Sequence, residues 1–561
     1  MAVIPKIVLP EPGIYTMKIG ILIKDFNLLE NWELRILDKI RKDPSLELSL
    51  LIRDGRKKVG ESKGIRLRKL MRAGNVAGKI LFKAQTVVES KIFKSPYTVN
   101  KQEIITWLST IKSIEVTPQQ KGFLDIFSKA DAEMVKAYNL DIILRHEFNI
   151  IRGEILDASA HGIWSFHHGD NSINRGSPAG FWEVYLKQPV VGVTLQKLTS
   201  ELDGGLVIDR GYFNRHWAFY KTNRNIHEDS VSILFKSINR LQQGKLTLSK
   251  SPVYYNPLYK VPSFGITLQY IFRFYKNLVT KMLGSLRSKF FGARHDCWTL
   301  FIGKGNYMES TLFKLKPQDL PKNEFWADPF LFPYNDELYV FFEVYDYKAA
   351  KGKISCGKLV DNKITGVIDI LDLKTHLSYP FIFSEGNDIF MIPENSGSLR
   401  LEVYKCVEFP AKWELYSTAF EGEELIDTTY FIDDSGQRWL FLNKGLDKIY
   451  GELHIYKIDS LKLNTIESHS LNPVIIDSRI ARNGGAIFRQ NGNIYRPSQC
   501  SINGIYGYGL NLNIIQKLTI DEYEEEKIIT VEPNFKKGLI ATHHVHQLKD
   551  IFVIDACYKR M

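Results

Sequence analysis

The sequence predicts two domains of different fold class, an α/β domain followed by an all-β domain. Residues 17–245 alternate short apolar strands with segments of helical periodicity, whereas residues 297–561 consist of short aromatic strands that end in Asn, Asp or Gly turns. The chain has 561 residues, more than one hydrophobic core usually supports. Its composition, 44% apolar and 24% charged, is ordinary for globular protein.

Strands and helices follow one another in the first half. KIGILIK (18–24) is a predicted strand, ENWELRILDKIRKD (30–43) a predicted helix and LELSLLIRD (46–54) a second strand, which makes a βαβ opening. DIFSKADAEMVKAYNLDIILRH (125–146) predicts a helix and a buried strand, and EILDASAHGIWSFHH (154–168) a short helix and another strand. No Gly-x-Gly-x-x-Gly follows the first strand, so we do not expect a dinucleotide site.

A polar loop follows the last of these strands. The stretch WSFHHGDNSINRG (164–176) begins inside the strand and runs past its carboxyl end. Ligands of open α/β sheets bind outside the carboxyl ends of the strands. We therefore expect a catalytic or binding loop here.

The second half repeats one pattern five times. Each copy has a small or polar start, a Phe-rich strand, a turn and a second aromatic strand, and the copies start at residues 327, 377, 426, 483 and 543. A β-sandwich would show similar hairpins without this recurrence. Five diverged copies of one four-stranded unit predict a five-bladed β-propeller over residues 297–561.

Residues 246–296 form a basic linker that contains a predicted amphipathic helix at 263–294. Nine apolar side chains fall on one helical stripe: Leu268, Ile271, Phe272, Tyr275, Leu278, Val279, Met282, Leu286 and Phe290. The charged residues of the segment are all basic: Arg273, Lys276, Lys281, Arg287, Lys289 and Arg294. Such a helix either packs against a domain or lies in a membrane interface, and both interpretations stay open.

The cysteines and the N-terminus suggest a cytoplasmic protein. The five cysteines all lie in the second half with no two at metal-ligand spacing, which disfavours a zinc site and a disulfide framework. The N-terminus does not resemble a secretory signal, and no run of 18 apolar residues occurs. The net charge of +11 fits an anionic partner, at the inner face of the membrane or on a phosphorylated substrate, or else surplus surface lysine.

Four segments of the first half resemble one enzyme family. They are LDIILRHEFNIIRGEILDASAHG (140–162), GIWSFHHGDNSINRG (162–176), GVT (192–194) and LDGG (202–205). In this order they resemble the formyltransferases that use 10-formyltetrahydrofolate, such as methionyl-tRNA formyltransferase, glycinamide ribonucleotide transformylase and the sugar-nucleotide N-formyltransferases. The resemblance spans residues 17–245 and implies a Rossmann-like domain with 10-formyltetrahydrofolate as donor.

The resemblance implies roles for particular residues. His167 takes the place of the catalytic histidine and Asp203 that of the catalytic aspartate. The residues that match the framework or extend the loop are the expected substrate- and folate-binding set: His168, Asp170, Asn171, Arg175, Gly176, Gly192, Thr194 and Gly205. His167 is expected to donate to the oxyanion or to transfer protons, and Asp203 to orient it or to hold a water.

One position departs from the family. Ser165 stands where the family has the asparagine whose amide donates to the formyl oxygen in the transition state. Losing one such donor typically costs roughly 100- to 1,000-fold in rate. Two groups could replace the missing amide donor: the serine hydroxyl acting through a water, or the side chain of Asn171 after a change of conformation. The alternative is that the fold is retained and catalysis is lost.

The second half resembles five-bladed propellers that handle carbohydrate. FWADPFLF (325–332), FFEVY (341–345), LSYPFIF (377–383), MIPEN (391–395) and IDTTYF (426–431) resemble propellers of arabinanase-type glycoside hydrolases and the propeller domain of plant glucosamine inositolphosphorylceramide transferases. The expected channel-facing carboxylates are Asp328, Glu343, Glu394 and Asp427. They would hydrolyse a glycosidic bond, bind sugar hydroxyls beside aromatic rings, or only cap turns.

Histidines near the C-terminus do not change this expectation. His543, His544 and His546 lie close in sequence, but no third ligand is evident, so no metal is expected.

The two halves together suggest an enzyme of glycoconjugate biosynthesis. The first hypothesis is N-formylation of an amino sugar on a nucleotide or lipid carrier, with the propeller binding carbohydrate. The second is a glycan-binding protein with a degenerate formyltransferase fold, and the third a carbohydrate-active transferase or hydrolase that works from the propeller. A nucleic-acid partner is disfavoured, because a propeller replaces the small β-barrel expected of a tRNA formyltransferase.

Overall fold

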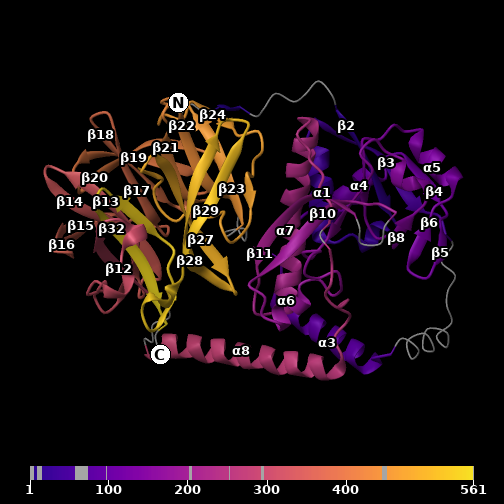
Figure 1. Cartoon of the computed structure of the whole chain (residues 1–561), viewed down its shortest axis with the longest axis horizontal. Coiled ribbons are helices and arrows are strands. Elements are labelled where there is room, and N and C mark those ends of the chain that lie inside the picture. Colours follow the sequence, from indigo (N-terminus) through magenta and orange to yellow (C-terminus); the bar gives the residue numbers. More distant parts are fainter. Residues whose placement is uncertain are drawn as a thin grey trace. The chain divides into compact units, whose positions relative to one another are not determined.

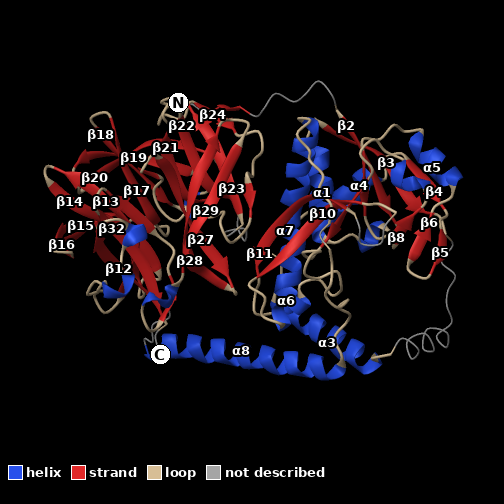
Figure 2. Cartoon of the chain, in the orientation of Figure 1, coloured by secondary structure: helices blue, strands red, loops and turns tan. Residues whose placement is uncertain are grey.

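The structure, a computed structural model, divides into two compact units. It describes residues 6–8, 16–56, 74–95, 98–200, 205–251, 253–291, 296–444 and 451–559. One unit is Glu11–Asn277, and the other joins Met1–Pro10 to Leu278–Met561. The first mixes helices with strands, whereas the second is built almost entirely of strands (Figure 2). The expected linker, residues 246–296, is thus divided between the two units.

A seven-stranded sheet organises the α/β unit (Figure 1). Its strand order is β11-β10-β9-β7-β2-β3-β4, in which neighbours from β9 to β4 run parallel and β10 and β11 run antiparallel. The bounds are β2 Met17–Ile23, β3 Leu46–Asp54, β4 Ser113–Val116, β7 Ile142–Arg145, β9 Ile163–His167, β10 Val190–Lys197 and β11 Leu206–Asn214. A separate three-stranded sheet contains β5 Gln119–Lys121, β6 Leu124–Ile126 and β8 Ile150–Arg152.

Helices bury the central strands of this sheet. Side chains of β2 and β7 such as Ile19, Ile21 and Ile143 are fully buried, as expected for parallel strands covered on both faces. The long helix α7 packs on β10 and β11, and α1 packs on α7 and β3. The helices of the unit are α1 Asn31–Lys42, α3 Val76–Ile92, α4 Lys101–Leu108, α5 Lys129–Lys136, α6 Phe181–Tyr185 and α7 Phe219–Gln242.

Helix α8, Phe264–Phe291, forms within the predicted segment 263–294. In its first half, Tyr270 and Phe274 are 3% and 1% exposed, and the Tyr270 hydroxyl donates to Glu89 of α3 at 2.6 Å. Most of the apolar stripe named from the sequence stays in solvent, with Phe272 and Phe290 about 70% exposed. The aromatic face that packs is therefore a different one from the stripe.

Five antiparallel sheets account for the β-structure described between residues 296 and 559. They are β13–β16, β17–β20, β21–β24 with β25, β26–β29, and a last sheet in which β12 pairs with β32 near the C-terminus. β1, Lys6–Val8, adds a parallel edge strand to β24. The bounds are β12 Cys297–Lys304, β13 Glu324–Tyr334, β14 Glu337–Asp346, β15 Lys351–Val360, β16 Lys363–Leu371, β17 Ser378–Glu385, β18 Asp388–Glu394, β19 Leu401–Glu408, β20 Lys412–Ala419, β21 Leu425–Ile432, β22 Arg438–Lys444, β23 Glu452–Ile458, β24 Thr465–Ser468, β25 Ile475–Ile476, β26 Phe488–Gln490, β27 Asn493–Ile502, β28 Ile505–Leu518, β29 Tyr523–Val531, β30 Leu539–Ala541, β31 Val545–Leu548 and β32 Ile551–Tyr558.

Candidate functional site

The carboxyl ends of β7 and β9 bring an arginine against the serine that replaces the family asparagine. β7 and β9 are parallel neighbours, so Arg145 at the end of β7 lies beside Ser165 of β9. Arg145 Nη1 donates to Ser165 Oγ at 2.9 Å, while Nε and Nη2 donate to the Phe148 carbonyl at 3.0 and 2.6 Å. Burial lowers the pKa of Arg145, which nevertheless stays a cation because an arginine titrates far above neutrality.

A cavity of about 320 Å³ opens beside this pair. Its lining joins the strand ends to the start of α1 and to α7: Leu28, Glu30, Trp32, Glu33, Arg145, His146, Glu147, Ser165, Phe166, His168 and His227. A second cavity of about 440 Å³ shares Glu30, Trp32 and His227 with it. The unit thus has two adjoining compartments, one at the carboxyl ends of β7 and β9 and one lined by residues at or next to α1, α3 and α7.

His168 belongs to an aromatic wall of the first cavity. Its ring stacks on His227 with centroids 3.7 Å apart, and the Trp32 ring lies 5.2 Å away. Burial lowers the pKa of both histidines, and for His168 the neighbouring His227 and His167 add to this effect. Both rings are therefore neutral near pH 7. This wall of the cavity can pack against a flat ligand without adding positive charge.

His167 turns instead towards the loop that follows it. Its Nε2 lies 2.7 Å from the Asn174 carbonyl, which requires the ring proton on Nε2. Thr194 of β10 is its partner across the sheet, and the Thr194 hydroxyl donates to the Gly169 carbonyl at 3.1 Å. The other expected catalytic residue, Asp203, lies in 201–204, outside the described residues.

The polar side chains of the loop are used to hold the loop together. Asp170 is 7% exposed and accepts from the backbone and hydroxyl of Ser172 and from the Tyr212 hydroxyl. Asn171, 2% exposed, donates to Ser251 at 2.9 Å and accepts from Arg210 at 2.9 Å. Their expected contact with substrate stays a prediction, and so does a swing of Asn171 towards Ser165.

The remaining framework positions fit close backbone approaches. Arg175 Nε donates to the Asn171 carbonyl at 2.8 Å. A Cβ at Gly176 would lie 2.1 Å from the Tyr259 carbonyl oxygen, one at Gly192 2.7 Å from Asp170 Cβ, and one at Gly205 2.9 Å from the Lys197 carbonyl oxygen. These glycines let the loop close on its neighbours.

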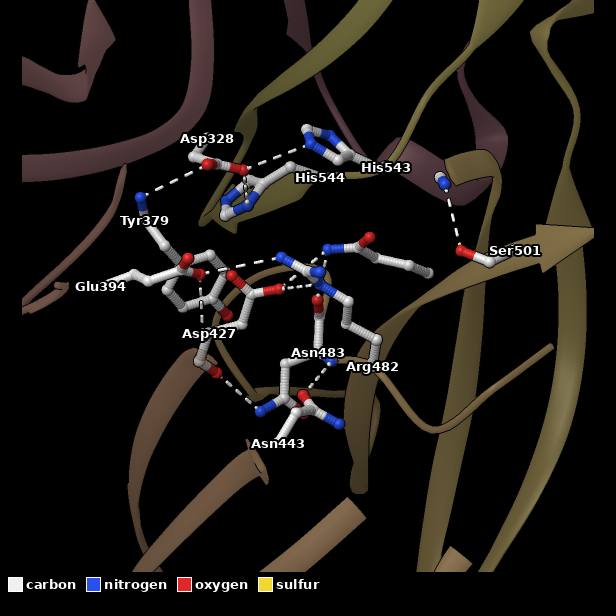
Figure 3. Close-up of polar contacts among 12 residues, drawn as sticks. Asp328, Tyr379, Glu394, Asp427, Asn443, Arg482, Asn483, Ser501, His543 and His544 are labelled. Carbon is white, nitrogen blue, oxygen red and sulfur yellow. Dashed lines mark hydrogen bonds and ion pairs between the residues drawn. The ribbon is translucent and has the colours of Figure 1, made fainter. Parts of the chain in front are cut away.

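In the all-β unit, three sheets share an unusual backbone feature at the start of the inner strand. Asp328, Tyr379 and Asp427 have left-handed φ values of 51°, 45° and 46°, each beside a break in strand register. The Tyr379 N–H donates to Asp328 at 3.3 Å, and the Asp427 N–H donates to Glu394 at 3.3 Å (Figure 3). Non-glycine residues in this conformation persist only where the surroundings over-determine them, often at functional sites.

These strand starts surround a cavity of about 330 Å³ that is rich in carboxylates. Three of the four expected carboxylates, Asp328, Glu343 and Glu394, line it. Aromatic rings and cationic groups complete the wall, among them Trp298, Phe325, Tyr345, His376, Arg482, Tyr506 and His543. Asp427, the fourth carboxylate, does not line the cavity but lies 2.5 Å from Arg482 Nε, so it holds that guanidinium in place (Figure 3).

The crowding of buried carboxylates shifts their protonation. Burial raises the pKa of Asp328 to about 7, with Asp427 and Asp555 adding and His543 opposing. Burial and the neighbouring Asp328 and Glu394 also raise the pKa of Glu343 well above its usual range. At neutral pH the cavity therefore presents carboxylic acid groups that can donate hydrogen bonds as well as carboxylates that accept them.

Sequence reasoning missed several members of both sites. Arg145 ends an apolar strand, a position that signals the ligand edge of an α/β sheet. In the all-β unit the missed members are Arg482, which precedes the fourth repeat, and Asp555, which lies 2.7 Å from His543, a histidine considered in the sequence as a metal ligand and set aside. Asp328, His543 and Asp555 are buried and each offers one atom within 4.8 Å of the others, close enough to hold a metal ion.

The chain shows sequence similarity in its second half. Residues 313–550 match the family model described as glucosamine inositolphosphorylceramide transferase 1, N-terminal. The protein of that name from Oryza sativa subsp. japonica is 36% identical over 229 residues, covering 39% of this chain and 30% of the relative, and the one from Arabidopsis thaliana is 35% identical over 241 residues, covering 41% and 30%. The chain thus spans less than a third of the length of these relatives.

Two solved structures show a distant similarity to parts of this chain. Glycinamide ribonucleotide transformylase 1 from Symbiobacterium toebii has 16% identity and a TM-score of 0.28, covering 42% of this chain and 95% of its own. An α-L-arabinanase mutant from Cellvibrio cellulosa has 16% identity and a TM-score of 0.31, covering 43% and 88%. Values this low assign no activity, and the similarity that is shown is that of the all-β region to the N-terminal part of the plant transferases.

Proposed function

We propose that this chain transfers a formyl group from 10-formyltetrahydrofolate to the amine of an amino sugar that is carried on a nucleotide or a lipid. The observation that carries the proposal is the placement of Arg145 and Ser165 at the carboxyl ends of β7 and β9 on the wall of the 320 Å³ cavity, with His167 at the end of the same strand β9. Two compartments leave separate room for donor and acceptor. The order of motifs from residue 140 to 205 supports the same reaction.

The chemistry asks for a proton acceptor and an oxyanion donor near each other. The amine nitrogen attacks the formyl carbon, so one proton must leave the amine and one must reach the departing folate nitrogen. With the proton of His167 on Nε2, facing the Asn174 carbonyl, a neutral ring has its lone pair on Nδ1, the atom that would accept the amine proton. The stacked neutral rings of His168 and His227, with the Trp32 ring edge to face against His168, would pack against a flat donor ring.

Calorimetry with 5-formyltetrahydrofolate, a stable analogue of the donor, tests this function first. Micromolar binding followed by turnover of a nucleotide-linked amino sugar is the expected result, and His167→Ala should abolish turnover while binding persists. His161→Ala, an exposed histidine away from both cavities, is the matched control. No binding by the folded chain would contradict formyl transfer and leave a glycan-binding protein with a degenerate formyltransferase fold.

We also infer that the five antiparallel sheets are the blades of one propeller. Inner-strand residues of successive sheets contact one another, as between Asp328 and Tyr379 and between Glu394 and Asp427. The last sheet pairs β12 with β32, which closes a ring by joining the two ends of the repeat region. The cavity would then lie at one mouth of the central channel and bind carbohydrate.

A second candidate function places chemistry in the all-β unit itself. The relatives of residues 313–550 are named transferases, and carboxyls with raised pKa beside a paired carboxylate are suited to acid–base work at a glycosidic bond. Glu394→Gln separates the candidates, because it should abolish glycosyl transfer or hydrolysis while leaving formyl transfer intact. If Glu394→Gln lowers formyl transfer and the wild type shows no glycosidic activity, the second candidate is contradicted.

We further propose that α8 rests on an anionic membrane surface. Its exposed apolar side chains Leu268, Phe272, Tyr275, Val279, Met282, Leu283, Leu286 and Phe290 fall within one arc of the helix. The helix contains five Lys or Arg residues and no Asp or Glu. Among the described residues, no helix combines the length and apolarity that crossing a bilayer requires. Such a helix fits the interface, where a lipid-linked acceptor would be presented.

Sedimentation with vesicles tests the membrane proposal. Vesicles of phosphatidylglycerol and phosphatidylcholine should carry the full chain down, and Phe272→Ser with Phe290→Ser should release it. Phe313→Ser removes a side chain of similar exposure outside α8 and serves as the control. Equal sedimentation of all three proteins would contradict the assignment.

A further inference from the structure

Arg145 is half-buried at the cavity wall and makes no ion pair with a carboxylate among the described residues. Arg35, in contrast, lies 2.6 Å from Glu228, Arg482 2.5 Å from Asp427 and Arg496 2.6 Å from Glu525. Arg145 donates instead to a carbonyl oxygen and to the Ser165 hydroxyl. A guanidinium held in this way at a cavity wall suits a ligand oxygen that carries or develops negative charge.

The acidic groups near this guanidinium are already engaged. Glu33 lies 2.6 Å from His146, and Glu147 accepts from two backbone N–H groups at 3.0 Å. A third carboxylate, Asp125, is paired with a different arginine at 2.6 Å. Arg145 therefore has no direct carboxylate partner among the described residues, although Glu30, Glu33 and Glu147 line the same cavity.

We infer that Arg145 is a catalytic residue that stabilises the oxyanion of the formyl-transfer reaction, in place of the amide missing at position 165. The inference rests on the proposed function. Nη1 already points to Ser165 Oγ, and a serine is shorter than the asparagine it replaces, which leaves room for a guanidinium from the neighbouring strand. A cationic donor forms a stronger hydrogen bond to an oxyanion than a neutral amide does.

The step balances as follows. The lone pair of the amine forms a bond to the formyl carbon, and the C=O π pair moves to oxygen, which becomes the oxyanion facing Arg145 Nη1. His167 takes a proton from the amine nitrogen. The oxygen lone pair then reforms C=O, the bond between carbon and the folate nitrogen breaks, and His167 returns its proton to that nitrogen.

The test uses a reaction that needs no knowledge of the sugar. In hydrolysis of 10-formyltetrahydrofolate, water replaces the amine and the same oxyanion forms. Arg145→Met should lower the single-turnover rate constant by about 100- to 1,000-fold, while the dissociation constant of 5-formyltetrahydrofolate changes by less than about threefold. Arg152→Met, which removes an arginine that also donates only to carbonyl oxygens but lies outside the cavity, should leave the rate unchanged.

A rescue experiment separates catalysis from a structural role. Adding Ser165→Asn to the Arg145→Met chain should recover about tenfold in rate, because the amide again supplies a donor, whereas Ser165→Asn alone should not raise the wild-type rate. Equal rates for Arg145→Met and wild type, or a rate loss that Ser165→Asn leaves unchanged in a chain of wild-type thermal stability, would overturn the inference.

A second probe keeps the inference testable if the proposed function fails. If the wild type neither binds 5-formyltetrahydrofolate nor hydrolyses the donor, formyl transfer is refuted. Line broadening of 13C-formate in NMR, present for wild type and Arg152→Met but lost in Arg145→Met, would then support a carboxylate-binding site at Arg145. No broadening with the wild type would overturn that site as well.

Discussion

The cavity beside Arg145 and the cavity of the all-β unit hold their arginines differently. In the α/β unit the Arg145 guanidinium donates to a carbonyl oxygen and a hydroxyl and, within the described part of the chain, has no carboxylate within ion-pair distance, although Glu30, Glu33 and Glu147 line the same cavity. In the all-β unit the carboxylates outnumber the cations, and Arg482 is matched to Asp427. The first arrangement suits a ligand that develops negative charge, whereas the second suits hydroxyl groups that both donate and accept. Substitutions that remove a charged or titratable group from one cavity at a time test this difference.

The largest expected effect is the loss of the paired arginine in the all-β unit. Arg482→Met leaves Asp427 buried and unpaired, and breaking such a pair typically costs about 3–5 kcal/mol of unfolding free energy. Denaturant unfolding monitored by tryptophan fluorescence measures it. The double variant with Asp427→Asn should recover part of the loss, and an additive loss instead would contradict the pairing.

The second effect is on pH dependence, where the two units should respond in opposite directions. Protonation favours the folded all-β unit, because the pKa of Asp328 rises to about 7 in the folded state. Its stability should therefore fall as pH rises from about 4 to 7. Burial lowers the pKa of His168 and His227, so the α/β unit should lose stability as pH falls below about 6.5, the ordinary histidine value.

Thermal unfolding across pH 4 to 8 checks both slopes. The charged and titratable groups that act on Asp328 are Glu343, Glu394, Asp427, Arg482, His543, His544 and Asp555. Asp328→Asn should flatten the slope of the all-β transition, and His168→Gln that of the α/β transition. Each pKa unit of one group corresponds to about 1.4 kcal/mol. A slope that survives its own substitution would contradict the assignment.

A smaller effect is expected at the loop that supports His167. Gly192→Ala would place a Cβ 2.7 Å from Asp170 Cβ, so the loop or β10 must shift. Overpacking of this kind costs about 1–3 kcal/mol, and it should also lower turnover because the same loop holds the His167 ring. Unfolding and turnover of Gly192→Ala are compared with those of Gly265→Ala, a position where a Cβ would meet open space.

The sequence was most informative where a pattern recurs along the chain. Alternating strands and helices in the first half and recurring aromatic strands in the second gave the two classes of unit, and three of four expected carboxylates line one cavity. Polar residues of the 164–176 loop are harder to interpret, because Asp170 and Asn171 make hydrogen bonds that hold the loop, while their contact with substrate stays a prediction. Periodicity alone cannot distinguish these two uses.

Residues brought together from distant parts of the chain could not be predicted. Arg145 meets Ser165 because β7 and β9 are neighbours in the sheet, and His543 meets Asp328 across 215 residues of sequence. The apolar stripe of α8 was visible, but which face packs depends on partners such as Glu89 that the helix pattern does not contain. Pairings of this kind are fixed by topology rather than by local sequence.

The smallest effect concerns one buried hydrogen bond beside His167. Thr194 pairs with His167 across β9 and β10, and its hydroxyl donates to the Gly169 carbonyl. Thr194→Val keeps the shape but loses that bond, which should cost about 1 kcal/mol in the free energy of unfolding. Because this bond joins two neutral groups, the loss caused by Thr194→Val should be the same at 50 mM and 500 mM salt, whereas interactions between charged groups respond to salt. Denaturant unfolding of wild type and Thr194→Val at the two concentrations measures this. If the loss of unfolding free energy in Thr194→Val is smaller at high salt, then Thr194 acts through interactions between charges and not through its hydroxyl bond to Gly169.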